Sequence, residues 1–173
     1  LRSIYIDRSG FLWIGTLGGG LNKFDSRTGK FSHYRSSDAP DNLGSDHVPS
    51  IFEDTSGTLW IGTAGGGLNK FNRETETFTR YLRIAGDPNS LSNNTVDAIY
   101  EAPSEPGVLW VGTRNGGLNR FETAVGYFTC WKENPGDSHS LSSNQVTAVL
   151  EDSSGVLWVG TYGGGLNKAI VRQ

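Results

Sequence analysis

Hydrophobic and polar residues alternate in short segments along this chain, and turn residues separate the segments. In the unit that starts at Val48, we predict a first strand over residues 48–53, although Pro49 and the three-residue spacing from Val48 to Ile51 interrupt the alternation. Residues 58–63 are apolar on both faces, as expected for a strand packed between two neighbouring sheets. Residues 68–71 and 78–81 complete a set of four short strands.

One phrase, Leu-Trp-(Ile/Val)-Gly-Thr followed by a glycine-rich turn and Gly-Leu-Asn-(Lys/Arg), occurs four times. Its tryptophans are Trp13, Trp60, Trp110 and Trp158, which are 47, 50 and 48 residues apart. Four short antiparallel strands in a unit of roughly 48 residues are typical of a β-propeller blade. We therefore predict an all-β fold, a β-propeller of four-stranded antiparallel blades. About 3.75 blades are present, because the last unit lacks its outer strand.

The repeat divides the chain into blade 1 at residues 1–46, blade 2 at 47–95, blade 3 at 96–145 and an incomplete blade 4 at 146–173. Each blade buries a face on each neighbour, so an open arc would leave two apolar end faces in water. An unpaired edge is also expected along the third strand of blade 4, at residues 167–171. We expect a homodimer that completes a ring of about eight blades, or the remaining blades of a longer chain, in preference to a closed ring of four.

The repeated sequence pattern resembles the two-component regulator propeller repeat. The resemblance rests on Asn-x-Val-x-x-Ile-x-Glu at residues 94–101, Gly-x-Leu-Trp-Ile-Gly-Thr at 57–63 and Gly-Gly-Leu-Asn-Lys-Phe at 66–71, and it extends over essentially the whole chain. It implies the periplasmic, or otherwise extracytoplasmic, sensor region of a bacterial receptor. Such receptors are usually hybrid histidine kinases, sometimes diguanylate cyclases, and often respond to glycan-derived ligands. The resemblance also implies rings of about seven blades.

The composition limits the classes of partner. Lys and Arg total 15 against 18 for Asp and Glu, so we expect no nucleic-acid partner. No hydrophobic run has the length of a membrane span, so we expect no direct membrane insertion. Cys130 is the only cysteine, which excludes an internal disulfide. We expect it to be a small apolar filler on an outer strand.

Several features that could indicate chemistry have simpler explanations. The glycine run at residues 18–20 leads into a strand without a helix N-terminus, which favours a hairpin over a phosphate loop. Asp7, Asp54 and Asp152 are expected to form turns, and no copy supplies enough carboxylates for calcium, so we predict neither a metal site nor a cofactor. The three histidines occupy non-equivalent repeat positions, and no catalytic residue is predicted. A propeller enzyme, either a glycosidase or similar to streptogramin lyase, and a purely structural interaction ring are the alternatives to a non-catalytic binding module.

Strand order places the turn between the second and third strands at the same end as the linker between blades. The residue after Thr in that turn differs in every copy: Leu17, Ala64, Arg114 and Tyr162. We predict a binding site for a polar small molecule or oligosaccharide at this end, formed by Arg114, Asn115, Tyr162, Asp46, Asn94 and Asn144. Two other interpretations are open: turn tips vary when nothing constrains them, and the three linker residues could bond only local backbone.

Overall fold

The structure is a computed structural model that describes residues 1–170, and these residues form fifteen β-strands and no helix. The strands are β1 (Ser3–Ile6), β2 (Leu12–Gly15), β3 (Leu21–Asp25), β4 (Lys30–Tyr34), β5 (Ser50–Glu53), β6 (Leu59–Gly62), β7 (Leu68–Asn72), β8 (Thr77–Tyr81), β9 (Val96–Glu101), β10 (Val108–Thr113), β11 (Gly117–Glu122), β12 (Tyr127–Trp131), β13 (Val146–Glu151), β14 (Val156–Thr161) and β15 (Gly165–Ile170). Residues 171–173 lie outside the described part, so the predicted strand edge at 167–171 is described only to residue 170.

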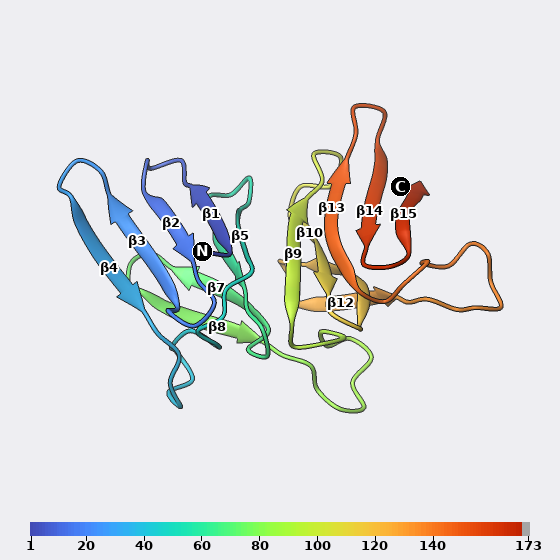
Figure 1. Ribbon diagram of the computed structural model, residues 1–173, viewed down its shortest axis with the longest axis horizontal. Coiled ribbons are helices and arrows are strands. Elements are labelled where there is room, and N and C mark those ends of the chain that lie inside the picture. The colour runs from blue at the N-terminus through green and yellow to red at the C-terminus, as the bar shows by residue number, and fades with distance from the viewer. Residues whose placement is uncertain (171–173) are drawn as a thin grey trace.

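The strands form four consecutive antiparallel sheets, which are the blades of a β-propeller (Figure 1). Three sheets have four strands, β1–β4, β5–β8 and β9–β12, and the fourth has β13, β14 and β15. The first strand of each blade contacts the first strand of the next: β1 with β5, β5 with β9, and β9 with β13. These strands therefore line the inner side of the arc, and the fold class predicted from the sequence is confirmed.

The first strand of blade 2 is shorter than predicted. β5 begins at Ser50 and not at Val48, because Pro49 has no N–H to donate to the ladder. The corresponding strands β9 and β13 have no proline and begin at Val96 and Val146.

Apolar side chains are buried mainly between blades. The cluster between the first two blades combines Trp13 and Leu21 of blade 1 with Leu59, Ile61 and Phe71 of blade 2. Two similar clusters follow, containing Trp60 and Trp110. The predicted burial of tryptophan between blades is confirmed for these three. It is wrong for Trp158, which is only half-buried because no described blade follows it.

A repeated aspartate holds the turn before the second strand in blades 1, 2 and 4. Asp54 accepts the backbone N–H of Thr58 through Oδ1, and through Oδ2 it accepts the indole N–H of Trp60 at 2.7 Å. Asp7 with Trp13 and Asp152 with Trp158 form the same bond. The predicted turn-forming role of these aspartates is confirmed.

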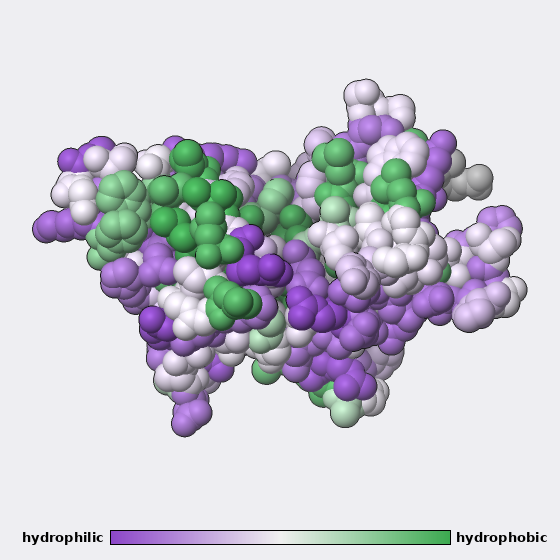
Figure 2. Space-filling view, viewed as in Figure 1, coloured by the Kyte–Doolittle hydropathy of each residue, from purple (hydrophilic) through white to green (hydrophobic). Residues whose placement is uncertain are grey.

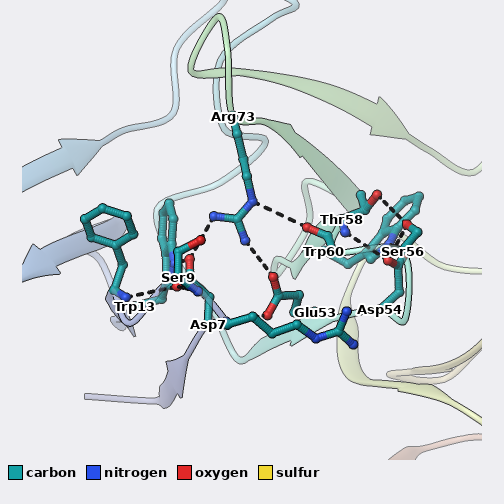
Figure 3. A network of polar contacts seen from close by, with 12 residues as sticks. Asp7, Ser9, Trp13, Glu53, Asp54, Ser56, Thr58, Trp60 and Arg73 are labelled. Atoms are coloured by element: carbon teal, nitrogen blue, oxygen red, sulfur yellow. Dashed lines mark hydrogen bonds and ion pairs between the residues drawn. The ribbon is translucent and has the colours of Figure 1, made fainter.

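An ion pair also joins the first two blades (Figure 3). The guanidinium of Arg73, in blade 2, donates to the carboxylate of Asp7, in blade 1, at 2.8 Å and to Glu53 at 2.9 Å. Both carboxylates are buried, whereas the Arg73 side chain is 33% exposed, so these charge-assisted bonds are partly shielded from water. Within the described residues no helix could cross a membrane.

Candidate ligand-binding end of the propeller

In blades 1, 2 and 3 the turn between the second and third strands is bonded to the linker that follows the same blade. Gly20 N–H donates to the carbonyl of Asp46 at 2.9 Å, and Gly67 donates to Asn94 at 2.8 Å. Gly117 donates to Asn144 at 2.8 Å. The prediction that these turns and linkers share one end of the propeller is therefore confirmed.

The side chains of Asp46, Asn94 and Asn144 have a common structural role. In each, Oδ1 accepts a backbone N–H from the start of the same linker, at 2.7, 2.6 and 2.8 Å respectively. Burial opposes ionisation of Asp46, but its bonds to Ser36 and Arg35 outweigh burial and keep its pKa below the ordinary value. These three residues shape the loops that border the candidate site, as the local-bonding interpretation expects.

Arg114 is the strongest polar feature at this end. Its Nε and Nη2 donate to the two carboxylate oxygens of Asp97 at 3.1 and 2.9 Å, a paired arrangement that fixes the plane of the guanidinium. The carboxylate of Asp97 raises the pKa of Arg114 above its ordinary value. The Arg114 side chain is nevertheless 39% exposed, so part of its donor surface faces solvent.

Asp97 reaches Arg114 because β9 contains a bulge. Val96 pairs with Thr113 and Ala98 pairs with Gly112, which leaves Asp97 as the extra residue. β13 has the same irregularity between Val146 and Ala148. Bulges redirect side chains and are common beside functional sites. Sequence reasoning missed Asp97, although the three-residue spacings from Val96 to Ile99 and from Val146 to Val149 already interrupt the alternation in these strands.

Asn115 has a conformational reason for its identity. Its φ is 70°, and the corresponding position in the other blades is Gly18, Gly65 or Gly163, each also with positive φ. Asn is among the few non-glycine residues that tolerate this region. The conformation of the turn thus accounts for Asn115 at this position.

Tyr162 occupies in blade 4 the position that Arg114 occupies in blade 3. Its N–H donates to the carbonyl of Gln145 at 2.9 Å, as Arg114 N–H donates to Thr95 at 3.0 Å. Tyr162 is 71% exposed. The structure therefore places the residues that differ most among the turns at equivalent sites, and brings Arg114 together with Asp97.

His47 adds a second polar group that sequence reasoning did not select. Its carbonyl accepts the N–H of Ala64, and its Nε2 is buried without a partner among the described residues. Burial, helped by the positive charges of Arg2 and Arg114, lowers the pKa of His47, whereas Asp97 acts in the opposite direction. Arg2, His47, Asp97 and Arg114 thus share one electrostatic neighbourhood across three blades.

Other candidates for chemistry remain apart. Cys130 lies on the outer strand β12, as predicted, where burial raises the pKa of its thiol and Sγ contacts the carbonyl of Gly116 at 3.1 Å. A thiol of this kind is a weak nucleophile. Residues 1–170 contain no group of three or more His, Cys, Asp or Glu side chains that could hold a metal ion.

The family model of the two component regulator propeller matches residues 1–18, 42–65 and 140–163. Three segments of the chain therefore match the two-component regulator propeller repeat. These segments include the second strands, with Trp13, Trp60 and Trp158, and the linkers that carry Asp46 and Asn144.

Solved structures support the same assignment. The extracellular domain of the proposed hybrid two component system BT3049 from B. thetaiotaomicron is 32% identical, with a TM-score of 0.82 over 96% of this chain and 23% of that one. The corresponding domain of BT4673 from the same organism is 25% identical, with a TM-score of 0.79 over 96% and 23%. This propeller thus spans under a quarter of the length of either structure. No curated protein matches the chain.

A more distant match shows the fold alone. The β-propeller domain of Cps50 (Swd1) from Myceliophteria thermophila is 16% identical, with a TM-score of 0.65 over 99% of this chain and 54% of that one.

Proposed function

We propose that this propeller is a non-catalytic, ligand-sensing module in the periplasmic part of a two-component receptor, and that its ligand is a polar saccharide. The similarity to two extracellular domains of such systems supports the location and the signalling role. The kinase or other output lies, in this proposal, outside the chain.

The pairing of Arg114 with Asp97 is the observation that carries the proposal. It holds a partly exposed guanidinium in a fixed plane at the end of the blades where the turns differ most. Fixed planar donors suit the vicinal hydroxyl or carboxylate oxygens of a sugar. The exposed ring of Tyr162 offers an aromatic face in the next blade.

The arrangement suits binding better than hydrolysis. A glycosidase generally needs two carboxyl groups, one of them an acid with a raised pKa, on either side of the scissile bond. Asp97 is bonded on both oxygens to Arg114. Asp46 has a lowered pKa and accepts the N–H of Ser36, which suits neither role.

Isothermal titration against a panel of neutral and acidic oligosaccharides tests the proposal. We expect one class to bind, and Arg114→Ala to weaken that binding by about tenfold or more, the effect of losing a charge-assisted hydrogen bond. Tyr162→Ala should also weaken binding of the same ligand. Arg27→Ala removes a similar exposed arginine from the turn after β3 and should leave binding unchanged. Release of hydrolysis products, or binding that ignores both substitutions, would contradict the proposal.

A further inference from the structure

A pocket of about 470 Å³ lies between the outer strand β12 of blade 3 and linker 2, the segment of residues 82–95 that connects β8 to β9 (Figure 1). Cys130 lines the pocket from β12, and Asp87 and Ser90 line it from linker 2. Cys130 shares a strand face with Phe128, whose ring packs against Tyr81 of blade 2 at 6.4 Å. The pocket is therefore bounded by blade 3 and by the linker that precedes it.

Cys130 occupies a position that holds an arginine in blade 2. Arg80 pairs with Asn69 across β7 and β8, as Cys130 pairs with Asn119 across β11 and β12. The guanidinium of Arg80 donates to four backbone carbonyls of linker 1, the segment of residues 35–49. Two of these bonds are short, 2.7 Å from Nε and 2.6 Å from Nη2. A cysteine side chain is too short to make such bonds, and in blade 3 the corresponding space is the pocket.

Linker 2 offers an acceptor that linker 1 uses for Arg80. Asn42 and Ser90 are equivalent, because the carbonyl just before each accepts the N–H of the outer strand's phenylalanine, at 2.7 and 2.9 Å. The carbonyl of Asn42 accepts Nε–H of Arg80. Among residues 1–170 no group donates a hydrogen bond to the carbonyl of Ser90. The carbonyl of Asp87, in contrast, already accepts the hydroxyl of Ser90 at 2.9 Å.

Charged side chains of both signs line this pocket, where blade 2 and linker 1 have uncharged ones. The replacements are Asp87 for Ala39, Lys132 for Leu82 and Arg83 for Ser36. Among residues 1–170 none of the three charged side chains forms an ion pair. Burial raises the pKa of the Cys130 thiol, and the positive charge of Lys132 acts in the opposite direction, so that charge lies beside the pocket.

We propose that this pocket binds a small zwitterion, with a guanidinium group at one end and a carboxylate at the other. The guanidinium takes the place of the Arg80 side chain, donates to the carbonyl of Ser90 and lies beside the carboxylate of Asp87. The carboxylate of the ligand pairs with Arg83 and Lys132. A guanidinium suits the inner end because its planar fork is the group that blade 2 already places there.

The pocket is a second site, separate from the end of the propeller that carries Arg114. None of the residues proposed to bind the saccharide lines it. The two proposals therefore stand or fall independently.

L-Arginine is the probe, titrated into the 173-residue protein and followed by calorimetry and by backbone amide chemical shifts. We expect saturable binding that shifts the amides of Ser92 and Lys132. Agmatine lacks the carboxylate of arginine, and L-citrulline replaces the guanidinium with a neutral urea. Each should bind at least about tenfold more weakly than arginine, because each lacks one set of charge-assisted bonds.

Substitutions at Cys130 test the location of the site. Cys130→Arg should abolish binding of L-arginine, because it fills the pocket with the side chain that blade 2 has there. The variant should remain folded, since it copies an arrangement already present in the molecule, and urea titration checks this. Cys130→Ser keeps the size of the side chain and should leave the affinity unchanged.

A substitution at Lys132 tests the contact with the carboxylate. Lys132→Gln should weaken binding of L-arginine about fivefold or more and leave agmatine unaffected, since agmatine has no carboxylate to lose. Lys30→Gln, at an exposed position of β4, is the matched control and should change neither affinity.

Four outcomes would overturn the proposal. The first is the absence of saturable binding up to about 10 mM L-arginine, beyond which specific recognition is too weak to matter. The second is equal affinity for arginine, agmatine and citrulline, and the third is binding that survives Cys130→Arg. The fourth is displacement of arginine by an oligosaccharide that binds at Arg114, which would assign the pocket to the saccharide site.

Discussion

Trp60 and Asp54, six residues apart on adjoining elements, are joined by a buried hydrogen bond of 2.7 Å from the indole Nε1 to Oδ2. The equivalent tryptophan of blade 3 has no such partner. Ala102 follows the first strand there, where Asp54 follows it in blade 2, and Trp110 Nε1 is buried without a partner among the described residues. The same fold therefore contains a bonded and an unbonded copy of one side chain.

This contrast gives the first prediction. Trp60→Phe should destabilise the protein by about 1–3 kcal/mol more than Trp110→Phe, because only the first leaves a buried carboxylate oxygen unsatisfied. Both substitutions remove similar apolar area, so each serves as the control for the other. The measurement is the free energy of unfolding from urea titrations. Equal losses would show that the indole bond contributes nothing measurable.

The second prediction concerns the ion pair between Arg73 and Asp7. Burial opposes ionisation of Asp7, but bonds from Trp13 and Arg73 outweigh it and hold its pKa below the ordinary value. A lowered folded-state pKa means that this stabilisation is fully present above the unfolded pKa of about 3.9 and is lost as the pH falls below it. Arg73→Met should therefore lower stability most at neutral pH. The difference in stability between the variant and the natural protein should become smaller below about pH 4.

Thermal unfolding of both proteins between pH 7 and 3 measures this difference in stability. Arg27→Met is a matched control, because Arg27 pairs with Asp25 at the surface, where exposed pairs contribute little. If the loss of stability caused by Arg73→Met stays constant with pH, the alkyl part of the Arg73 side chain, and not its charge, stabilises the contact between blades 1 and 2.

The third prediction separates turn geometry from ligand contact at Asn115. Asn115→Gly should keep or slightly raise stability, because Gly adopts a φ of 70° without strain. Asn115→Val should lower the free energy of unfolding by about 1–3 kcal/mol, since a β-branched residue is strained there. If the Gly variant loses saccharide binding while remaining folded, the side chain is a ligand contact in addition to its turn role.

The sequence predicted the blades well, because period, turn glycines and alternation are local properties that one unit already contains. It predicted the first strand of blade 2 too long, since the effect of Pro49 on pairing depends on which N–H groups the neighbouring strand needs. It could not predict that Trp158 is half-buried, because burial of that ring depends on the neighbouring blade and not on its own strand.

The candidate site was only partly predictable. Arg114 stood out as a difference between copies, but its partner Asp97 depends on a bulge that shifts pairing by one residue. The roles of Asp46, Asn94 and Asn144 required the linker conformations, which place a backbone N–H against each Oδ1.

The last prediction concerns the exposed end faces. Ile4, Ile6 and Phe31 are exposed on blade 1, where Figure 2 shows hydrophobic residues gathered over β1 and β2, and Leu150 and Leu166 are exposed on blade 4. Apolar surface of this kind favours association. We propose that two copies associate head to tail, blade 4 of one on blade 1 of the other, unless further blades of a longer chain cover these faces.

The junctions inside the molecule provide a sharp test of that geometry. At each one a glutamate at the end of the first strand accepts a backbone N–H from the preceding blade: Glu53 from Arg8, Glu101 from Thr55 and Glu151 from Ser104, at 2.8, 2.6 and 3.3 Å. Ile6 occupies this position in blade 1 and is 68% exposed. Ile6→Glu should therefore tighten a head-to-tail dimer that uses the same geometry, whereas it should weaken nonspecific apolar association. Light scattering over a dilution series distinguishes the two, and a dilution-resistant monomer in both proteins would rule out the dimeric ring.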